Sequence, residues 1–163
     1  MTVVGIMGRQ SRGAACCLRG ILENAGVNDK FTVIDMEQET DKIFPDILVA
    51  AGESNMANRV IEPRAEHFFI MNPDQKELLP YAANSRGILI TYGFNSKVCV
   101  TASSVMENEI QICVQRDLPT LSGRVIEQQE FSVTADTERS GPENFLAAIT
   151  TALVADVEVM VLN

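Results

Sequence analysis

Short apolar runs recur along this chain at the spacing of buried strands. The first five runs cover Thr2–Met7, Phe31–Asp35 and residues 44–51, 67–71 and 87–93. Such nearly continuous apolar runs are typical of strands that are buried on both faces, as in a parallel sheet. Helices are predicted between some of these runs, over residues 14–24 and 75–83, with apolar side chains on one face of the first. The alternation of strand and helix predicts a parallel sheet with helices on its faces.

The pattern changes in the second half of the chain. Three segments there are typical of an antiparallel unit: residues 97–105, 109–115 and 124–133. A hairpin at residues 106–108 joins the first two, and the second alternates with period two, which indicates one solvated face. A last helix starts at Pro142 and runs over residues 145–155. The sequence therefore predicts an α/β fold of three layers, with a mostly parallel sheet and a small antiparallel insert.

The composition is that of a soluble globular protein. The chain has 163 residues, of which 46% are hydrophobic and 21% are charged, and this predicts one domain over residues 1–163. No internal repeat, low-complexity tract or linker divides it. No apolar run reaches the ~18 residues of a membrane span, and the N-terminus lacks the basic leader of a signal peptide. We therefore expect a cytoplasmic protein without membrane attachment.

The net charge and the cysteine spacing argue against a nucleic-acid partner and against disulfide or metal sites. The net charge of −9 argues against a nucleic-acid partner, because nucleic-acid binding needs a basic face. The four cysteines, Cys16, Cys17, Cys99 and Cys113, show neither metal-ligand nor redox spacing. We expect them to be reduced thiols buried in the core, and we assign no disulfide and no metal site.

The first turn is the most informative motif for function. A loop with two glycines, Gly8-Arg9-Gln10-Ser11-Arg12-Gly13, connects the first strand to the first helix. Amide N–H groups and a partial positive charge at a helix N-terminus favour an anion there. However, the loop lacks the Gly-Lys-Ser/Thr that serves nucleoside triphosphates. Three interpretations stay open: a nucleotide site, a disabled nucleotide site, and a tight turn.

Four segments follow one another in an order typical of one enzyme family. They are residues 4–13 with the helix end at 20–26, the Pro-Asp-Ile strand at 44–49, the stretch from Ile70-Met71-Asn72-Pro73-Asp74 to Thr91-Tyr92-Gly93, and residues 142–149 with Asn144. Together they resemble the central, ATP-binding domain of the Mur ligases, which add amino acids to peptidoglycan precursors; folylpolyglutamate synthetase is a relative. The resemblance implies a P-loop-like first turn and ATP or phosphate as the ligand.

The departures from the family concern its catalytic groups. Ser11 stands where the family has its last loop glycine, Arg12 where it has lysine, and Gly13 where it has the hydroxyl that reaches Mg²⁺. Residues 52–66 contain no clear counterpart of the Asp-His-Leu-Asp stretch or of the carbamylated lysine; Arg59 and Arg64 are the nearest cations. The family's flanking domains have no counterpart in the sequence. We expect that this chain alone does not assemble a complete ligase site.

Other candidate residues have a structural alternative. Asn72 and Asp74 follow a strand, at the edge where α/β sheets place ligands. The favoured interpretation is structural: Asn72 starts a turn, and Asp74 caps the next helix. Asn144 resembles the family asparagine near adenine, and it equally suits the first turn of a helix. His67 is a candidate base or a plain strand-edge residue. Glu53, Glu62 and Glu66 fit no metal-ligand pattern and suit solvated loops.

The leading hypothesis is a degenerate, stand-alone Mur-ligase-like protein without ligase activity of its own. It retains nucleotide or anion binding at the first turn and acts through a protein partner or a homo-oligomer. The alternatives are a nucleotide-binding subunit of a split ATP-dependent ligase and a ligand-free interaction module. We assign no catalytic residue and no metal ligand. The residues assigned to the nucleotide or anion are Gly8, Arg9, Gln10, Ser11, Arg12, Gly13, Asn72, Asp74 and Asn144.

Overall fold

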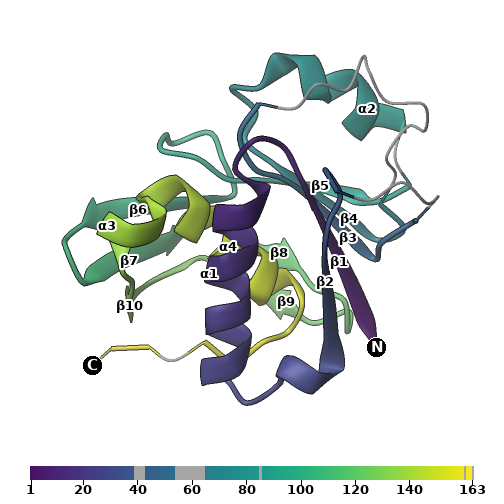
Figure 1. The fold of residues 1–163 in the computed structure, drawn as a ribbon. Coiled ribbons are helices and arrows are strands. Elements are labelled where there is room, and N and C mark those ends of the chain that lie inside the picture. Colours follow the sequence, from purple (N-terminus) through teal and green to yellow (C-terminus); the bar gives the residue numbers. More distant parts are fainter. Residues whose placement is uncertain (39–42, 54–64, 85, 160, 163) are drawn as a thin grey trace.

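A parallel sheet of five strands forms the centre of the molecule (Figure 1). The computed structural model describes residues 1–38, 43–53, 65–84, 86–159 and 161–162. The strands are β1 (Thr2–Met7), β2 (Phe31–Asp35), β3 (Ile47–Ala50), β4 (Phe68–Met71) and β5 (Ile88–Thr91), in the order β2-β1-β3-β4-β5. All neighbours in this sheet pair in parallel, which confirms the expected parallel sheet.

The helices differ from the expected ones mainly at their ends. They are α1 (Ser11–Asn24), η1 (Asn28–Lys30), η3 (Lys76–Leu78), α2 (Leu79–Asn84), α3 (Thr137–Ser140) and α4 (Pro142–Val154). Helix α1 starts three residues earlier than predicted, and the helix expected over residues 75–83 is a 3₁₀ turn followed by α2. Helix α3 was not predicted, because four residues carry too little periodicity to be recognised. The segment at residues 54–64 lies outside the described residues.

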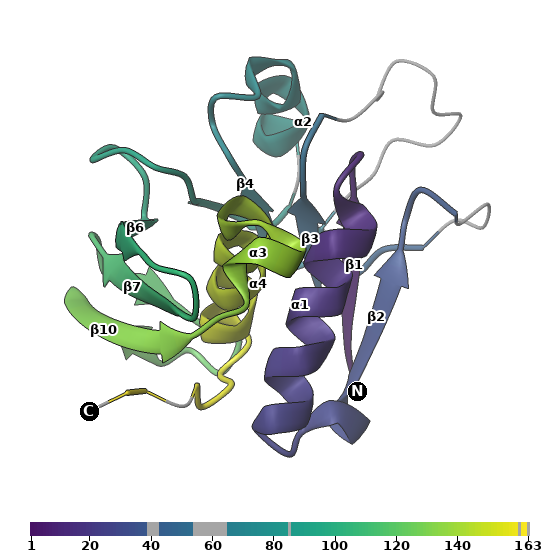
Figure 2. The same cartoon turned by 60° about the vertical axis from the view of Figure 1, so that its left-hand side comes forward.

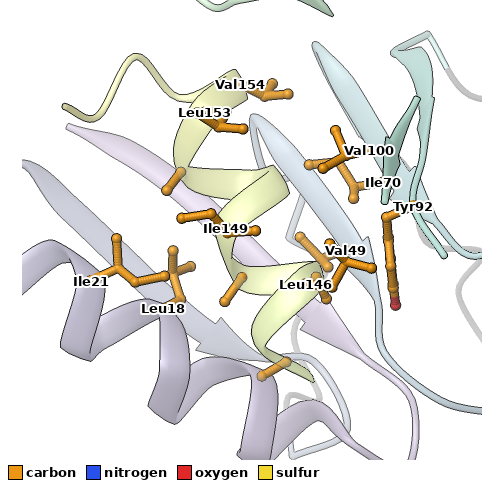
Figure 3. Packing of buried hydrophobic residues seen from close by; sticks show 14 of the residues in the cluster. Leu18, Ile21, Val49, Ile70, Tyr92, Val100, Leu146, Ile149, Leu153 and Val154 are labelled. Atoms are coloured by element: carbon orange, nitrogen blue, oxygen red, sulfur yellow. The ribbon is translucent and has the colours of Figure 1, made fainter. Parts of the chain in front are cut away.

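Two apolar clusters divide the molecule into three layers. On one face of the sheet, α1 and α4 pack together, and Leu18 and Ile21 approach Ile149 (Figure 3). On the other face, Leu78 and Ala82, from the segment of η3 and α2, complete a cluster with strand residues. These strand residues are Met7, Leu48, Ala50, Phe69 and Met71. Helix, sheet and helix thus form the three layers expected from the sequence.

A second, antiparallel sheet stands beside the first. It consists of β6 (Val100–Val105), β7 (Glu109–Val114) and β10 (Gln129–Thr134) in the order β10-β7-β6, and β8 (Leu118–Pro119) pairs with β9 (Val125–Ile126). Ile110, Ile112 and Val114 of β7 are buried, and the residues between them are half-buried. The predicted hairpin and the period-two alternation are therefore confirmed.

Helix α4 lies between the two sheets and α1 (Figure 2). Its residues 145–154 are all buried, which is the behaviour of a helix that is surrounded on every side. Two of them are polar, and each donates its hydroxyl to the preceding turn: Thr150 to Leu146 O at 2.7 Å and Thr151 to Ala147 O at 2.8 Å. The helix thereby joins both sheets in one core and brings its N-terminus to the carboxyl edge of β1.

Candidate functional site

The first turn borders a pocket at the carboxyl ends of β1 and β2. Open α/β sheets place their ligands at this edge. The pocket has a volume of about 290 Å³. The described residues that line it come from the first turn and the start of α1, from the end of β2 with the segment after it, and from the segment after β3: Gly8, Arg9, Ser11, Arg12, Asp35, Glu37, Gln38 and Glu53. Sequence reasoning assigned the four from the first turn and the start of α1, and it missed Asp35 at the end of β2 and the two residues that follow this strand.

Gly8 is required by the geometry of the turn. Its φ is +103°, and a Cβ at this position would lie 2.2 Å from Ala51 O. A side chain would therefore clash with backbone that cannot yield, in a conformation that residues other than glycine rarely adopt. The turn itself spans only residues 8–10, because helix α1 already begins at Ser11.

The amide groups of the turn are bound by the protein itself. The Arg9 N–H donates to Glu53 O, and the Gln10 N–H donates to Ala51 O, both at 2.9 Å. The Ser11 N–H donates to Gly8 O at 3.1 Å. These three donors face carbonyl oxygens of the chain, so they do not converge on an external ligand. This arrangement differs from the cradle implied by the resemblance.

The fourth amide of the turn binds a carboxylate. The Gly8 N–H donates to Glu37 Oε1 at 2.6 Å. A bond of this length to an ionised acceptor is among the stronger hydrogen bonds in proteins. Glu37 follows β2, and its own N–H donates to Asp35 Oδ1 at 3.1 Å, which shapes the turn after that strand. The chain therefore supplies its own anion to the first turn.

Among the described residues that line the pocket, acidic side chains slightly outnumber basic ones. Arg9 and Arg12 face three carboxylates, those of Asp35, Glu37 and Glu53. Arg9 lies 3.5 Å from Glu53, but both side chains are at least three-quarters exposed, so this ion pair contributes little to stability. Arg12 is exposed on the first turn of α1. An excess of carboxylates opposes the binding of a highly charged triphosphate.

Asn144 contacts the first turn and the start of α1. Its Nδ2 donates to Ser140 O at 2.8 Å and to Gln10 Oε1 at 3.3 Å. The same nitrogen lies so close to Gly13 that a Cβ there would be 2.5 Å away. Gly13 is thus a packing position beneath Asn144, and this contact joins the N-terminal ends of α1 and α4.

Asn72 also lies at this edge, but Asp74 does not act as expected. The Asn72 Nδ2 donates to Glu143 Oε1 at 3.3 Å, beside Asn144, while Asn72 Oδ1 accepts the Asp74 N–H at 3.0 Å. The turn expected at Asn72 is therefore present. The cap expected from Asp74 is wrong, because η3 has Gln75 at its N-cap and no side-chain capping bond.

Tyr92 is a buried residue at this edge that sequence reasoning did not assign. Its hydroxyl donates to Ala50 O at 2.7 Å and thereby ties the end of β5 to the end of β3. Burial, with a smaller contribution from the Glu143 carboxylate, raises the pKa of Tyr92 far above its ordinary value. Tyr92 is therefore a neutral structural donor. The sequence did contain a signal for this residue, because Tyr92 is an aromatic residue that stands between a predicted strand and Gly93.

The other candidate residues from the sequence lie away from the first turn or outside the described residues. His67 precedes β4, at the edge opposite the first turn, and its Nε2 is 3.7 Å from Asp46 Oδ1. Glu66 lies 4.0 Å from Arg86. Three of the sequence candidates, Arg59, Glu62 and Arg64, lie outside the described residues. Within the described residues, no group of three or more acidic, histidine or cysteine side chains is placed to hold a metal ion.

The cysteines are less buried than expected. All four are free, Cys16 is exposed, and the other three are half-buried. The expectation of a core position is wrong for Cys16, which lies on the outer face of α1, whereas Cys17 and Cys99 pack against the main apolar cluster. Burial raises the pKa of the Cys17 thiol, against the opposing effect of a hydrogen bond with Ser140.

Comparisons with known proteins do not extend these observations. Neither the protein-family models nor the curated proteins searched include a match for this chain. The Mur-ligase resemblance thus stays a prediction that rests on the motifs. Across the described residues, none of the helices has the length and apolar character needed to cross a membrane.

Proposed function

We propose that this chain is a Mur-ligase-like domain that has no ligase activity of its own. Its first turn descends, in this proposal, from an anion site and is now occupied by the chain's own carboxylate. The observation that supports this most directly is the hydrogen bond from the Gly8 N–H to Glu37 Oε1. A turn whose amides bind the protein itself has few donors left for the phosphates of ATP.

The groups at the start of α1 support the same proposal. Arg12 has a planar guanidinium in place of the compact ammonium of lysine, so it offers charge with a different geometry. Gly13 has no hydroxyl for Mg²⁺, and Asn144 covers it. Phosphoryl transfer depends on metal and charge placement around the transferred group. A turn of this composition is poorly suited to that chemistry.

Phosphate release tests the proposal. The purified chain is incubated with ATP, Mg²⁺ and candidate amino acids, and inorganic phosphate and ligated product are measured against an active Mur ligase. We expect no release above the rate without protein. ATP-dependent ligation by the chain alone would refute the proposal.

A second candidate is a subunit of a split ligase, with the remaining domains on another chain. The observation that favours it is the start of β5, the last strand in the order of the main sheet, where adjacent residues point to opposite faces and both are exposed: Ile88 by 52% and Leu89 by 38%. Exposed apolar groups at a sheet edge are typical of a surface that another chain covers. An adjacent reading frame that encodes the remaining ligase domains would support this candidate. Its absence would favour the first proposal.

A further inference from the structure

We propose that the outer edge of β10, with the apolar pocket beside it, binds an extended, basic peptide segment of a partner protein. The peptide adds to the antiparallel sheet as a further strand. This sheet has the order β10-β7-β6, so β10 is one of its two outer strands. Outer strands present backbone N–H and C=O groups with which another chain can pair. The surface shares no residue with the first turn.

The backbone of β10 alternates between β7 and the outer side of the sheet. On the β7 side, the Ala135 N–H donates to Asn108 O at 3.0 Å, whereas on the outer side Ser132 O accepts the Leu162 N–H at 2.7 Å. Ser132 and Leu162 form an isolated antiparallel bridge. Because backbone groups alternate along a strand, Glu130 also directs its N–H and C=O to the outer side. The outer side thus already pairs with one extended residue.

The chain's own C-terminal segment indicates how a peptide would lie. This segment runs beside β10 in both views (Figures 1 and 2). Next to the bridging Leu162, Val161 lines a pocket of about 540 Å³ together with Phe131 of β10. In an added strand, residues in the position of Leu162 therefore bond to β10, and the residues between them enter the pocket. Val161 and Leu162 are both exposed, so a longer strand can replace them without opening the core.

The lining of the pocket favours apolar side chains. Most of the described residues that line it are apolar, and they come from β9, from β10, from the end of α4 and from the segment after α4, among them Val125, Ile126, Phe131, Leu153 and Val157. Ligand sites in proteins typically have volumes of roughly 300–1,000 Å³ and a mainly apolar lining. A pocket of this size accepts alternate side chains of the size of valine or leucine.

The charges around this edge favour a basic partner. Glu127 and Glu158 line the pocket, and the side chain of Glu130 lies on the face opposite Phe131, where the residues between the apolar ones would come. Arg124, the basic residue among the described lining, has its Nε 3.6 Å from Asp156 Oδ1. The net charge of −9 also repels an acidic peptide or a second copy of the chain. Lysine or arginine at the alternate positions complements these carboxylates.

A synthetic peptide that alternates valine and lysine over about six residues, the usual length of a strand, is the probe. Its affinity for the unmodified chain is measured by titration calorimetry, beside the same peptide with glutamate in place of lysine. Two further peptides carry methyl groups on the amide nitrogens of either the lysines or the valines. We expect the glutamate peptide and the lysine-methylated peptide to bind at least about tenfold more weakly, because they lose the charge attraction or the bonds to β10. The valine-methylated peptide is the matched control and should keep its affinity.

Two pairs of variants test the surface from the side of the chain. Val125→Lys should weaken binding of the valine–lysine peptide by about tenfold, whereas Val105→Lys, at an exposed valine of β6, should not. Leu162→Pro removes the N–H that bonds to Ser132 O and should strengthen binding by about threefold, the effect of one net hydrogen bond. Leu162→Ala keeps this N–H and is its control. Amide exchange at Glu130 should slow when the peptide is bound.

Three results would overturn the inference. The first is that neither the unmodified chain nor Leu162→Pro binds the valine–lysine peptide. The second is equal affinity of Val125→Lys and Val105→Lys, or of the lysine-methylated and valine-methylated peptides. The third is a dimer of the chain alone, seen by sedimentation, that Val125→Lys dissociates, because a second copy would then be the occupant of this edge.

Discussion

At the scale of single residues, glycines at two positions in the first 20 residues have opposite roles. Gly8 adopts a positive φ and has backbone where a Cβ would be, whereas Gly20 lies inside α1 with no heavy atom within 4 Å of its would-be Cβ. The first glycine is therefore needed by the fold. The second only weakens a helix, because glycine has more freedom to lose on folding than alanine has.

Alanine substitutions at these two positions should change stability in opposite directions. Gly8→Ala should lower the free energy of unfolding by at least about 2 kcal/mol, because strain and a backbone clash combine. Gly20→Ala should raise it by about 0.5–1 kcal/mol. Chemical denaturation of both variants measures the difference. A Gly8→Ala variant as stable as the unmodified chain would contradict the positive φ of Gly8 and its close approach to Ala51 O.

The first turn shows which features of single residues the local sequence did not predict. The stretch of residues 8–13, which the motif predicted as a loop, is helical from Ser11 onward, where Ser11 is buried and Asn144 packs over Gly13. The partner of the Gly8 amide was not predictable, since no local pattern relates residue 8 to residue 37. Amide direction depends on the tertiary contacts of a turn as much as on its glycines.

At the scale of elements, α4 and β5 illustrate opposite environments for the same residue type. Helix α4 is surrounded by α1 and both sheets, and Ile149 is fully buried there. Strand β5 is the last strand of the main sheet, and Ile88 at its start is 52% exposed. The sequence predicted both elements from their apolar residues, but it did not distinguish the surrounded element from the exposed one.

Isoleucine-to-alanine substitutions should separate the two environments. Ile149→Ala should cost about 2–5 kcal/mol of unfolding free energy, because it leaves a cavity in a closely packed core. Ile88→Ala should cost less than about 1 kcal/mol, since much of the side chain is already in water. Equal losses in denaturant unfolding would contradict the burial of α4, or would show that β5 is covered in solution.

At the scale of the whole molecule, the two sheets share one apolar cluster. Residues of β3 and β4 belong to it, as do Ile110 and Ile112 of β7, with α4 between the sheets. A shared core links the stability of the parts, because neither sheet can lose α4 without exposing its own apolar face. The prediction of a single domain therefore has a physical basis in α4.

We expect the whole chain to unfold in one cooperative transition. Amide exchange at β4 and at β7, followed in increasing denaturant, should report the same midpoint and the same free energy of unfolding. Circular dichroism provides the matching global signal. Separate midpoints for the two sheets would mean that the antiparallel unit folds independently, and would divide the chain into two domains.

The sequence by itself determined the five strands of the parallel sheet, the helices α1 and α4, and the hairpin of the antiparallel sheet. Burial on both faces or on one face of a strand leaves a direct pattern of apolar side chains. The sequence also placed the first turn and Asn72 after strands, whereas the structure brought Asn144 to the same edge of the sheet. Only the tertiary structure decided what the first turn binds, because Glu37 reaches Gly8 through the pairing of β1 with β2. Hydrogen-bond partners far apart in the chain follow from such pairing, and no local pattern encodes them.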